Sequence, residues 1–157
     1  MENEITTGTS ATTFSPNNPC TRGQIVTFLW RANGQPEPTI TTNPFTDVKS
    51  SDYFYKAVLW AVEKEITAGT SKTTFSPNDT VTRAQTVTFL WRAEGKPAAD
   101  TKNPFTDVPA GQYYTDAVLW AVKNNVTAGT SATTFSPNNP CTRAQIVTFL
   151  YRDLAKK

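Results

Sequence analysis

Histidine is absent from this sequence of 157 residues, and only two cysteines are present. Without histidine there is no Ser-His or Cys-His nucleophile pair, no HExxH zinc motif and no His-ligated zinc. Two cysteines are too few for a four-thiolate zinc or iron–sulfur site within one chain. These absences exclude much of enzyme chemistry, and we expect neither a cofactor nor a metal ion.

Charge is also sparse, since charged residues make up 18% of the chain and the formal net charge is +2. A charge this small argues against a general nucleic-acid binder. No apolar run approaches the roughly 20 residues of a transmembrane helix, so we expect no membrane span. With 38% hydrophobic residues, the chain suits one compact domain or a few small repeats that share a core.

What the sequence does contain is an internal repeat. The segment GTSATTFSPNNPCTR at 8–22 returns as GTSKTTFSPNDTVTR at 69–83 and as GTSATTFSPNNPCTR at 129–143. The block NPFTDV occurs at 43–48 and 103–108. The first repeat lacks this block and almost all of its first helix. We therefore divide the chain into a partial first repeat over 1–38, a second repeat over 39–98 and a third repeat over 99–157.

Each full repeat is predicted to hold two helices separated by a loop. Apolar residues at helical spacing predict a first helix over about 52–65 and again over about 112–125. The second helix begins at a threonine that is followed three residues later by glutamine, which is a capping box. The TTFSPN loop carries a phenylalanine that we expect to be its buried anchor. These threonines are Thr21, Thr82 and Thr142, and the phenylalanines are Phe14, Phe75 and Phe135.

The two cysteines occupy equivalent places in the first and third repeats. Cys20 and Cys141 correspond to Val81 of the second repeat. A position that accepts either Cys or Val is a small, buried apolar site. The sequence leaves open whether the two thiols are free or bridged.

All six arginines lie in the second helices, at two repeat positions. The macrodipole favours those near the helix end, but it opposes those at the first position by about 0.3 kcal/mol or more. A guanidinium beside free N-terminal amides is a receptor for a carboxylate or phosphate. The alternative is an internal salt bridge to Asp47 or Asp107. The first-position set is Arg22, Arg83 and Arg143, and the other set is Arg31, Arg92 and Arg152.

The aromatic and acidic residues also have two alternative roles, one structural and one in ligand binding or catalysis. A tryptophan beside an arginine can stack on a sugar ring, but aromatic residues at helical spacing favour the core. The tyrosines at the start of the first helices are expected to be exposed. The aspartates fit turn and cap roles better than a calcium site or an acid/base pair. The residues concerned are Trp60, Trp120, Trp30, Trp91 and Tyr151; Tyr53, Tyr113 and Tyr114; and Asp47, Asp52, Asp107 and Asp116.

The sequence resembles S-layer homology (SLH) domain repeats over nearly its whole length. The residues that carry the resemblance are Phe-Thr-Asp-Val, Ala-Val-x-Trp-Ala, Ile/Val-Thr-x-Gly, Phe-Ser-Pro-Asn and Thr-Arg-Ala-Gln, in this order. Two departures concern the last motif. Glutamine replaces the usual glutamate of the family at Gln24, Gln85 and Gln145, and Gly23 replaces alanine.

The resemblance implies a mostly α fold, with tandem helix-loop-helix repeats in a pseudo-threefold arrangement around a central helical bundle. It further implies grooves between repeats that bind secondary cell-wall polysaccharide, often pyruvylated. The motif arginine contacts this anionic ligand and the glycine lines the groove. The ligand-binding residues expected on this basis are Arg22, Arg83, Arg143, Gly8, Gly69 and Gly129, with Trp60 and Trp120 as further candidates.

We therefore interpret the chain as a non-enzymatic cell-wall-anchoring module of a secreted Gram-positive surface protein. Several weak sites would add by avidity. The alternative is a structural or protein–protein interaction scaffold that binds no glycan. Exposed groove arginines favour anchoring, and arginines paired with aspartate favour the scaffold. The truncated first repeat also predicts an open apolar face through which the chain associates with another copy.

Overall fold

The computed structural model describes residues 5–100 and 102–155, and these ranges contain five α-helices and no sheet. The predicted mostly α class is therefore confirmed. Residues 1–4 and 156–157, at the outer ends of the first and third repeats, lie outside the described residues. No helix in the described ranges has the length and apolar character needed to cross a bilayer. The helices are α1 (Arg22–Ala32), α2 (Tyr55–Glu63), α3 (Arg83–Ala93), α4 (Thr115–Lys123) and α5 (Arg143–Leu154).

The second helix of each repeat begins where its capping box predicts. At α1 the Thr21 hydroxyl accepts a hydrogen bond from the backbone N–H of Gln24 at 3.3 Å. The Gln24 Oε1 in turn accepts from the N–H of Thr21 at 3.1 Å. The same reciprocal pair is present at α3 and α5. Glutamine completes the box as glutamate does, because either side chain offers an acceptor oxygen.

The first helices, α2 and α4, each lack the first three and the last two residues of their predicted ranges. The start is later because a turn precedes α2, in which the N–H of Tyr55 donates to the carbonyl of Asp52 at 3.0 Å. The end is earlier because Glu65 takes a left-handed φ of 55°. The N–H of Ile66 then reaches the carbonyl of Ala61 at 2.8 Å, which satisfies one of the last helical carbonyls. α4 ends in the same way.

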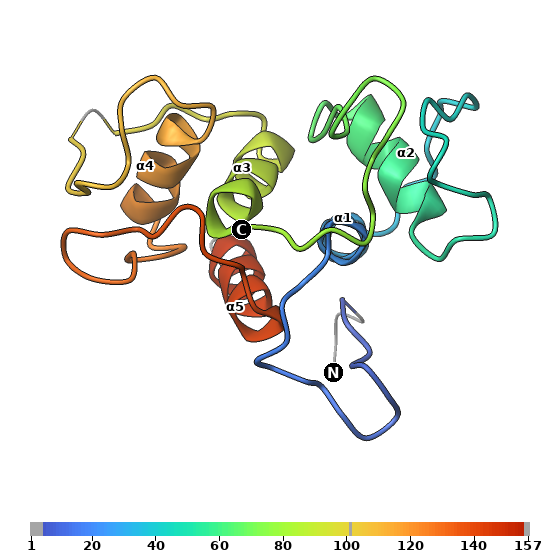
Figure 1. Cartoon of the computed structure of the whole chain (residues 1–157), viewed down its shortest axis with the longest axis horizontal. Coiled ribbons are helices and arrows are strands. Elements are labelled where there is room, and N and C mark those ends of the chain that lie inside the picture. Colours follow the sequence, from blue (N-terminus) through green and yellow to red (C-terminus); the bar gives the residue numbers. More distant parts are fainter. Residues whose placement is uncertain (1–4, 101, 156–157) are drawn as a thin grey trace.

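Helices pair across repeats rather than within them. α1 of the first repeat packs against α2 of the second, and α3 of the second packs against α4 of the third. In Figure 1, α1, α3 and α5 lie toward the middle, with α2 and α4 outside them. The N-terminal segment forms a projection of its own, in which the described residues hold no helix.

Three backbone contacts join the repeats in a closed cycle. The N–H of Cys20 donates to the carbonyl of Cys141, that of Cys141 to Val81, and that of Val81 to Cys20, each at 2.9 Å. This cycle is compatible with the expected pseudo-threefold arrangement. All three side chains are fully buried, so the predicted small apolar site is confirmed, and both cysteines are free thiols. Burial disfavours the thiolate and raises the pKa of Cys20 to about 12.

The loop phenylalanines are not equally buried. Phe75 and Phe135 are fully buried, whereas Phe14 is only half-buried. The Phe75 ring packs against Phe45 with centroids 5.7 Å apart, and Phe135 packs against Phe105 at 5.8 Å. The described residues of the first repeat include no NPFTDV block that could supply such a partner. The prediction that Phe14 is a buried anchor is therefore wrong.

Candidate ligand-binding groove between repeats

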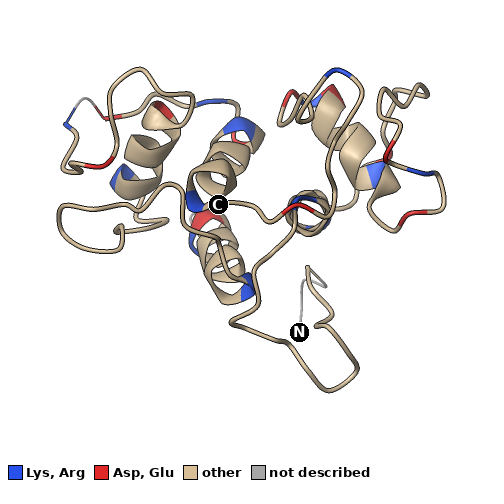
Figure 2. Cartoon of the chain, in the orientation of Figure 1, with Lys and Arg blue, Asp and Glu red and all other residues tan. Residues whose placement is uncertain are grey.

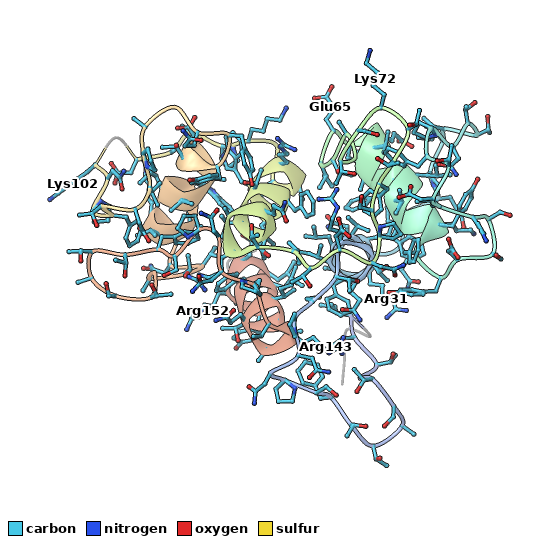
Figure 3. The ribbon with its side chains drawn as sticks, in the orientation of Figure 1. Arg31, Glu65, Lys72, Lys102, Arg143 and Arg152 are labelled. Carbon is cyan, nitrogen blue, oxygen red and sulfur yellow. The ribbon has the colours of Figure 1, made fainter. Side chains whose placement is uncertain are left out.

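The arginine at the first position of each central helix contacts the loop of the next repeat. Arg22 Nε donates to the carbonyl of Phe75 at 2.8 Å, and its guanidinium lies 4.9 Å from the centroid of the Phe75 ring. The same guanidinium also lies 5.5 Å from the centroid of the Phe89 ring. Arg83 makes the equivalent contacts with the third repeat and Arg143 with the first, which closes the cycle. Figure 3 shows Arg143 at the end of α5 that faces the first loop. Each such cation–π contact contributes about 0.5–2 kcal/mol.

The N-terminal amides of these helices are not free. The N–H of Arg22 donates to the carbonyl of Asp79 at 2.9 Å, and that of Gly23 donates to Pro77 at 2.8 Å. The loops of the third and first repeats cover α3 and α5 in the same way. The predicted receptor of free amides is therefore wrong, because the loop of the next repeat lies across each helix terminus. The packing is tight at Gly23, where a Cβ would lie 3.0 Å from the ring of Phe54.

The three arginines are buried, with exposed fractions of 5% for Arg22, 3% for Arg83 and 2% for Arg143. Arg22 and Arg83 each keep a buried Nη2 that has no hydrogen-bond partner within the described residues. Arg143 Nη2 instead donates to the hydroxyl of Thr6 at 3.3 Å. An unpaired buried donor costs about 1–3 kcal/mol. Burial also lowers the pKa of Arg22 and Arg83, because it disfavours the charged guanidinium.

The alternative ion pair with aspartate is not formed within the described residues. The carboxylate of Asp47 accepts from the N–H groups of Phe75 at 2.8 Å and Ser76 at 2.7 Å. Asp107 binds the third loop in the same way, and Asp52 accepts from a backbone N–H in the turn before α2. The predicted turn role is confirmed for Asp52, whereas Asp47 and Asp107 instead fix loop amides 28 and 29 residues further along the chain. Among the described residues no cluster of three or more acidic or cysteine side chains is placed to hold a metal ion.

A groove of about 400 Å³ lies beside Arg22 and takes residues from all three repeats. The second repeat supplies Arg92 and the segment around Gly69, and the third supplies Tyr113. Gly69 has a φ of +85°, and a Cβ there would lie 2.5 Å from both the Phe45 ring and a loop carbonyl. Only glycine fits this position, so the loop backbone itself forms the groove wall.

The groove carries two guanidinium groups and no acidic side chain. Arg92 Nη1 donates to the carbonyl of Ile66 at 3.1 Å, and the rest of this partly exposed side chain faces the groove. Burial raises the pKa of Tyr113, and the nearby Arg92 and Arg22 act in the opposite direction. Two cations and a phenol hydroxyl around one cavity suit a polar ligand that bears a carboxylate.

The same arrangement recurs around the other two loops, but not equally. Burial raises the pKa of Tyr53, and Arg143 and Arg31 act in the opposite direction, so the arginines near Tyr53 are the counterparts of those near Tyr113. No counterpart of this tyrosine exists around the third loop within the described residues. Figure 2 shows that the first and third loops are uncharged, so the helices supply the cations beside them. We name these the first site (Gly8, Arg31, Tyr53, Arg143), the second site (Gly69, Arg92, Tyr113, Arg22) and the third site (Gly129, Arg152, Arg83).

Sequence reasoning selected some of these residues and missed others. Arg22 and Gly69 line the groove, as expected. Trp60 and Trp120 are 4% exposed within the hydrophobic core, and neither lines this groove. Arg92 and Tyr113 were not singled out as ligand-binding residues. Their recurrence at fixed repeat positions was the available signal, but the cross-repeat packing that brings them together is not local in sequence.

The model of the S-layer homology domain matches residues 2–26, 44–87 and 104–147, which is more than half of the chain. The chain belongs to the S-layer homology domain family. The resemblance seen in the motifs is therefore confirmed. SLH domains are known as modules that bind cell-wall polymers, and matches to this domain cover most of the chain.

Three relatives show where similar regions occur. The endoglucanase of Bacillus sp. (strain KSM-635) is 35% identical over 109 residues, which cover 69% of this chain and 11% of that protein. The surface-layer 125 kDa protein of Lysinibacillus sphaericus is 34% identical over 102 residues, covering 65% and 9%. The middle cell wall protein of Brevibacillus brevis is 37% identical over 78 residues, covering 48% and 7%. The chain thus spans about a tenth of the length of these relatives. The surface-layer and cell wall proteins support a cell-wall-anchoring role and a secreted, cell-surface location for this SLH region.

Proposed function

We propose that this SLH region attaches its protein to the cell wall by binding a secondary cell-wall polysaccharide that carries the carboxylates of pyruvate ketals. One observation supports this most directly. Arg22, with an unpaired Nη2, lines a groove that also contains Arg92 and Tyr113 and lacks any acidic side chain. A carboxylate in this groove would meet two cations and no repulsive charge.

Binding at the second site follows from charge and shape. A hydrogen bond between a carboxylate and a guanidinium contributes about 1.5–3 kcal/mol in a partly desolvated groove. Arg22 is already held by the carbonyl of Phe75, so little side-chain entropy is lost when a ligand arrives. Gly69 keeps the loop backbone close to the ligand. The neutral sugar ring would then lie against Tyr113, at the open side of the groove.

Two sites on one chain strengthen attachment to a polymer. The first and second sites each combine a motif arginine, a second arginine and a tyrosine. A polysaccharide repeats its charged group along its length, so both sites can engage one molecule. The second contact is then intramolecular and raises the overall affinity without any new type of interaction.

The test measures binding to wall polysaccharide released from cells, before and after mild acid removes the pyruvate ketals. The variants are Arg31→Gln and Arg92→Gln combined, because Arg92 lines the groove, Arg31 is its counterpart at the first site, and neither residue closes the inter-repeat cycle. We expect their binding to fall at least about tenfold. Arg152→Gln, the counterpart at the third site, is the matched control and should bind as the unmodified chain does. Equal binding to acid-treated polysaccharide would contradict the proposal.

A second candidate is a scaffold that binds no glycan. The burial of all three motif arginines in contacts between repeats favours it, since these contacts have a structural role without any ligand. Failure of the unmodified chain to bind untreated polysaccharide would support this candidate. Loss of binding in the Arg31→Gln, Arg92→Gln variant, together with normal binding by Arg152→Gln, would count against the scaffold.

A further inference from the structure

The cycle of backbone contacts has three joints, each between two neighbouring repeats, and the chain itself runs through only two of them. The linker after α1 connects the first repeat to the second, and the linker after α3 connects the second to the third. No stretch of chain leads from the third repeat back to the first. Non-covalent contacts hold this joint, among them the hydrogen bond from Arg143 to the Phe14 carbonyl.

Both cysteines lie at the joint that the chain leaves open. Cys20 belongs to the first repeat and Cys141 to the third, and the remaining place in the cycle, in the second repeat, holds Val81. A covalent bond between the two sulfur atoms would therefore join the first repeat to the third. The only two cysteines of the chain thus coincide with the one joint that lacks a covalent connection.

The backbone places the two cysteines opposite each other. Pro19 and Thr142 form an antiparallel bridge, and the register of this bridge pairs Cys20 with Cys141. The N–H of Cys20 donates to the Cys141 carbonyl at 2.9 Å. Opposed residues of a hydrogen-bonded antiparallel pair have Cα atoms about 5.5 Å apart and side chains on the same face. Disulfides form at Cα separations of about 4.4–6.8 Å, so the backbone is suited to one.

The surroundings of the two thiols suit a bond between them. Both side chains are fully buried in the hydrophobic core, and a disulfide would add no polar atom to it. Charge on Cys141 is one of the causes that raise the pKa of Cys20, so the two sulfur atoms lie within electrostatic reach of each other. The structure shows the reduced form, and only this form has thiols that titrate.

We propose that Cys20 and Cys141 form a disulfide in the secreted protein and so close the cycle of three repeats covalently. The cell surface is an oxidising environment, in which disulfides persist. Each thiol gives up one proton and one electron, and an external disulfide accepts them as its own S–S bond is reduced to two thiols. Because the folded site is buried, this exchange takes place as the third repeat docks on the first. The inference does not depend on glycan binding.

The bond would act mainly on the unfolded chain. It would enclose roughly 120 residues in one loop, and the stabilisation that a disulfide gives by restricting the unfolded state increases with loop length. It would also keep the first repeat against the third when the other contacts of this joint open. We therefore expect the bridged chain to unfold at a higher temperature than the reduced chain.

The test refolds the whole chain from urea, either in a mixture of reduced and oxidised glutathione or in excess dithiothreitol. Iodoacetamide then alkylates the free thiols under denaturing conditions, and mass spectrometry counts them. We expect no alkylation after refolding in glutathione, and without alkylation a mass about 2 Da below that of the reduced chain. Proteolysis should release one pair of peptides joined through Cys20 and Cys141. The Tm should exceed that of the reduced chain by about 5–15 °C.

Cys20→Val is the matched control, because valine fills the equivalent place in the second repeat. Its Tm should be the same after both treatments. Three outcomes would overturn the proposal: two free thiols per unmodified chain after refolding in glutathione, a disulfide that joins two chains on a non-reducing gel, or an equal Tm for the two forms of the unmodified chain. Matching circular dichroism spectra show that both forms reach the same fold.

Discussion

The loops at 8–22 and 129–143 have identical sequences but different surroundings. Their backbones agree, with Gly8 and Gly129 at φ values of 82° and 85°. Ser15 and Ser136 also share a left-handed conformation, at 56° and 58°. The anchoring differs, because Phe135 is fully buried and Phe14 is only half-buried.

This difference separates what a loop sequence specifies from what its repeat supplies. The turn conformation is local and forms in both copies. Burial of Phe135 needs Phe105, and fixing of the backbone N–H groups of Phe135 and Ser136 needs the carboxylate of Asp107. Both come from the NPFTDV block of the same repeat. Both loops share the contact with an arginine of another repeat, which Arg143 makes with the Phe14 carbonyl and Arg83 with the Phe135 carbonyl.

The largest expected effect comes from truncating the two phenylalanines. Phe135→Ala removes a fully buried ring, and we expect it to lower the free energy of unfolding by about 3–5 kcal/mol. Phe14→Ala should cost less than half as much, since its ring is partly solvated. Urea denaturation followed by circular dichroism measures both. Equal losses would show that Phe14 is an anchor after all.

Removing the carboxylate of Asp107 should make the third loop behave like the first. Asp107→Ala leaves the N–H groups of Phe135 and Ser136 without their acceptor, at a cost of about 1–3 kcal/mol each. Amide hydrogen exchange at Ser136 should then approach the rate at Ser15. If protection of Ser136 is unchanged, another group must hold this loop.

The buried thiols predict a loss of stability at high pH. Burial raises the pKa of Cys20 from 9.0 to about 12, and it also raises the pKa of Cys141. Stability from a raised pKa is complete below the unfolded value and is lost as the pH rises through the folded one. Between pH 9 and about 12, Cys20 then costs about 1.4 kcal/mol per pH unit, and Cys141 acts in the same direction.

Val81 shows which control to use, because it fills the equivalent site without a thiol. The double variant Cys20→Val, Cys141→Val should lose less stability between pH 9 and 11 than the unmodified chain. Urea titrations at several pH values test this. Parallel curves for both proteins would mean that the thiols do not contribute.

The smallest expected effect concerns the feature that both loops share completely. Gln24→Glu and Gln145→Glu keep the capping box and add a negative charge near a helix N-terminus. Each should stabilise the protein by about 0.3–1 kcal/mol. The two gains should be equal, because the box is local in both repeats. Unequal gains in the free energy of unfolding, measured by urea denaturation, would show that the surroundings of each loop also affect its capping box.

Residues that act locally were predictable from the sequence, and residues that act across repeats were not. The caps at Thr21, Thr82 and Thr142 need only neighbours three residues away, and all three are confirmed. The buried site of Cys20 followed from comparing repeats. Arg22 was singled out as a ligand-binding residue and lines the groove, but its contact with Phe75 spans 53 residues and was not foreseen. The place of Tyr113 in the groove also depends on how the third repeat packs against the other two, and no local sequence pattern encodes this packing.

The central claim is that the sites between repeats hold an anionic wall polymer. The most direct measurement compares co-sedimentation of the chain with purified cell-wall sacculi, before and after hydrofluoric acid strips the attached polysaccharide. The account predicts that the chain pellets with intact sacculi and stays in solution with stripped ones. Equal pelleting with both would contradict it, because the chain would then bind peptidoglycan itself rather than the attached polymer.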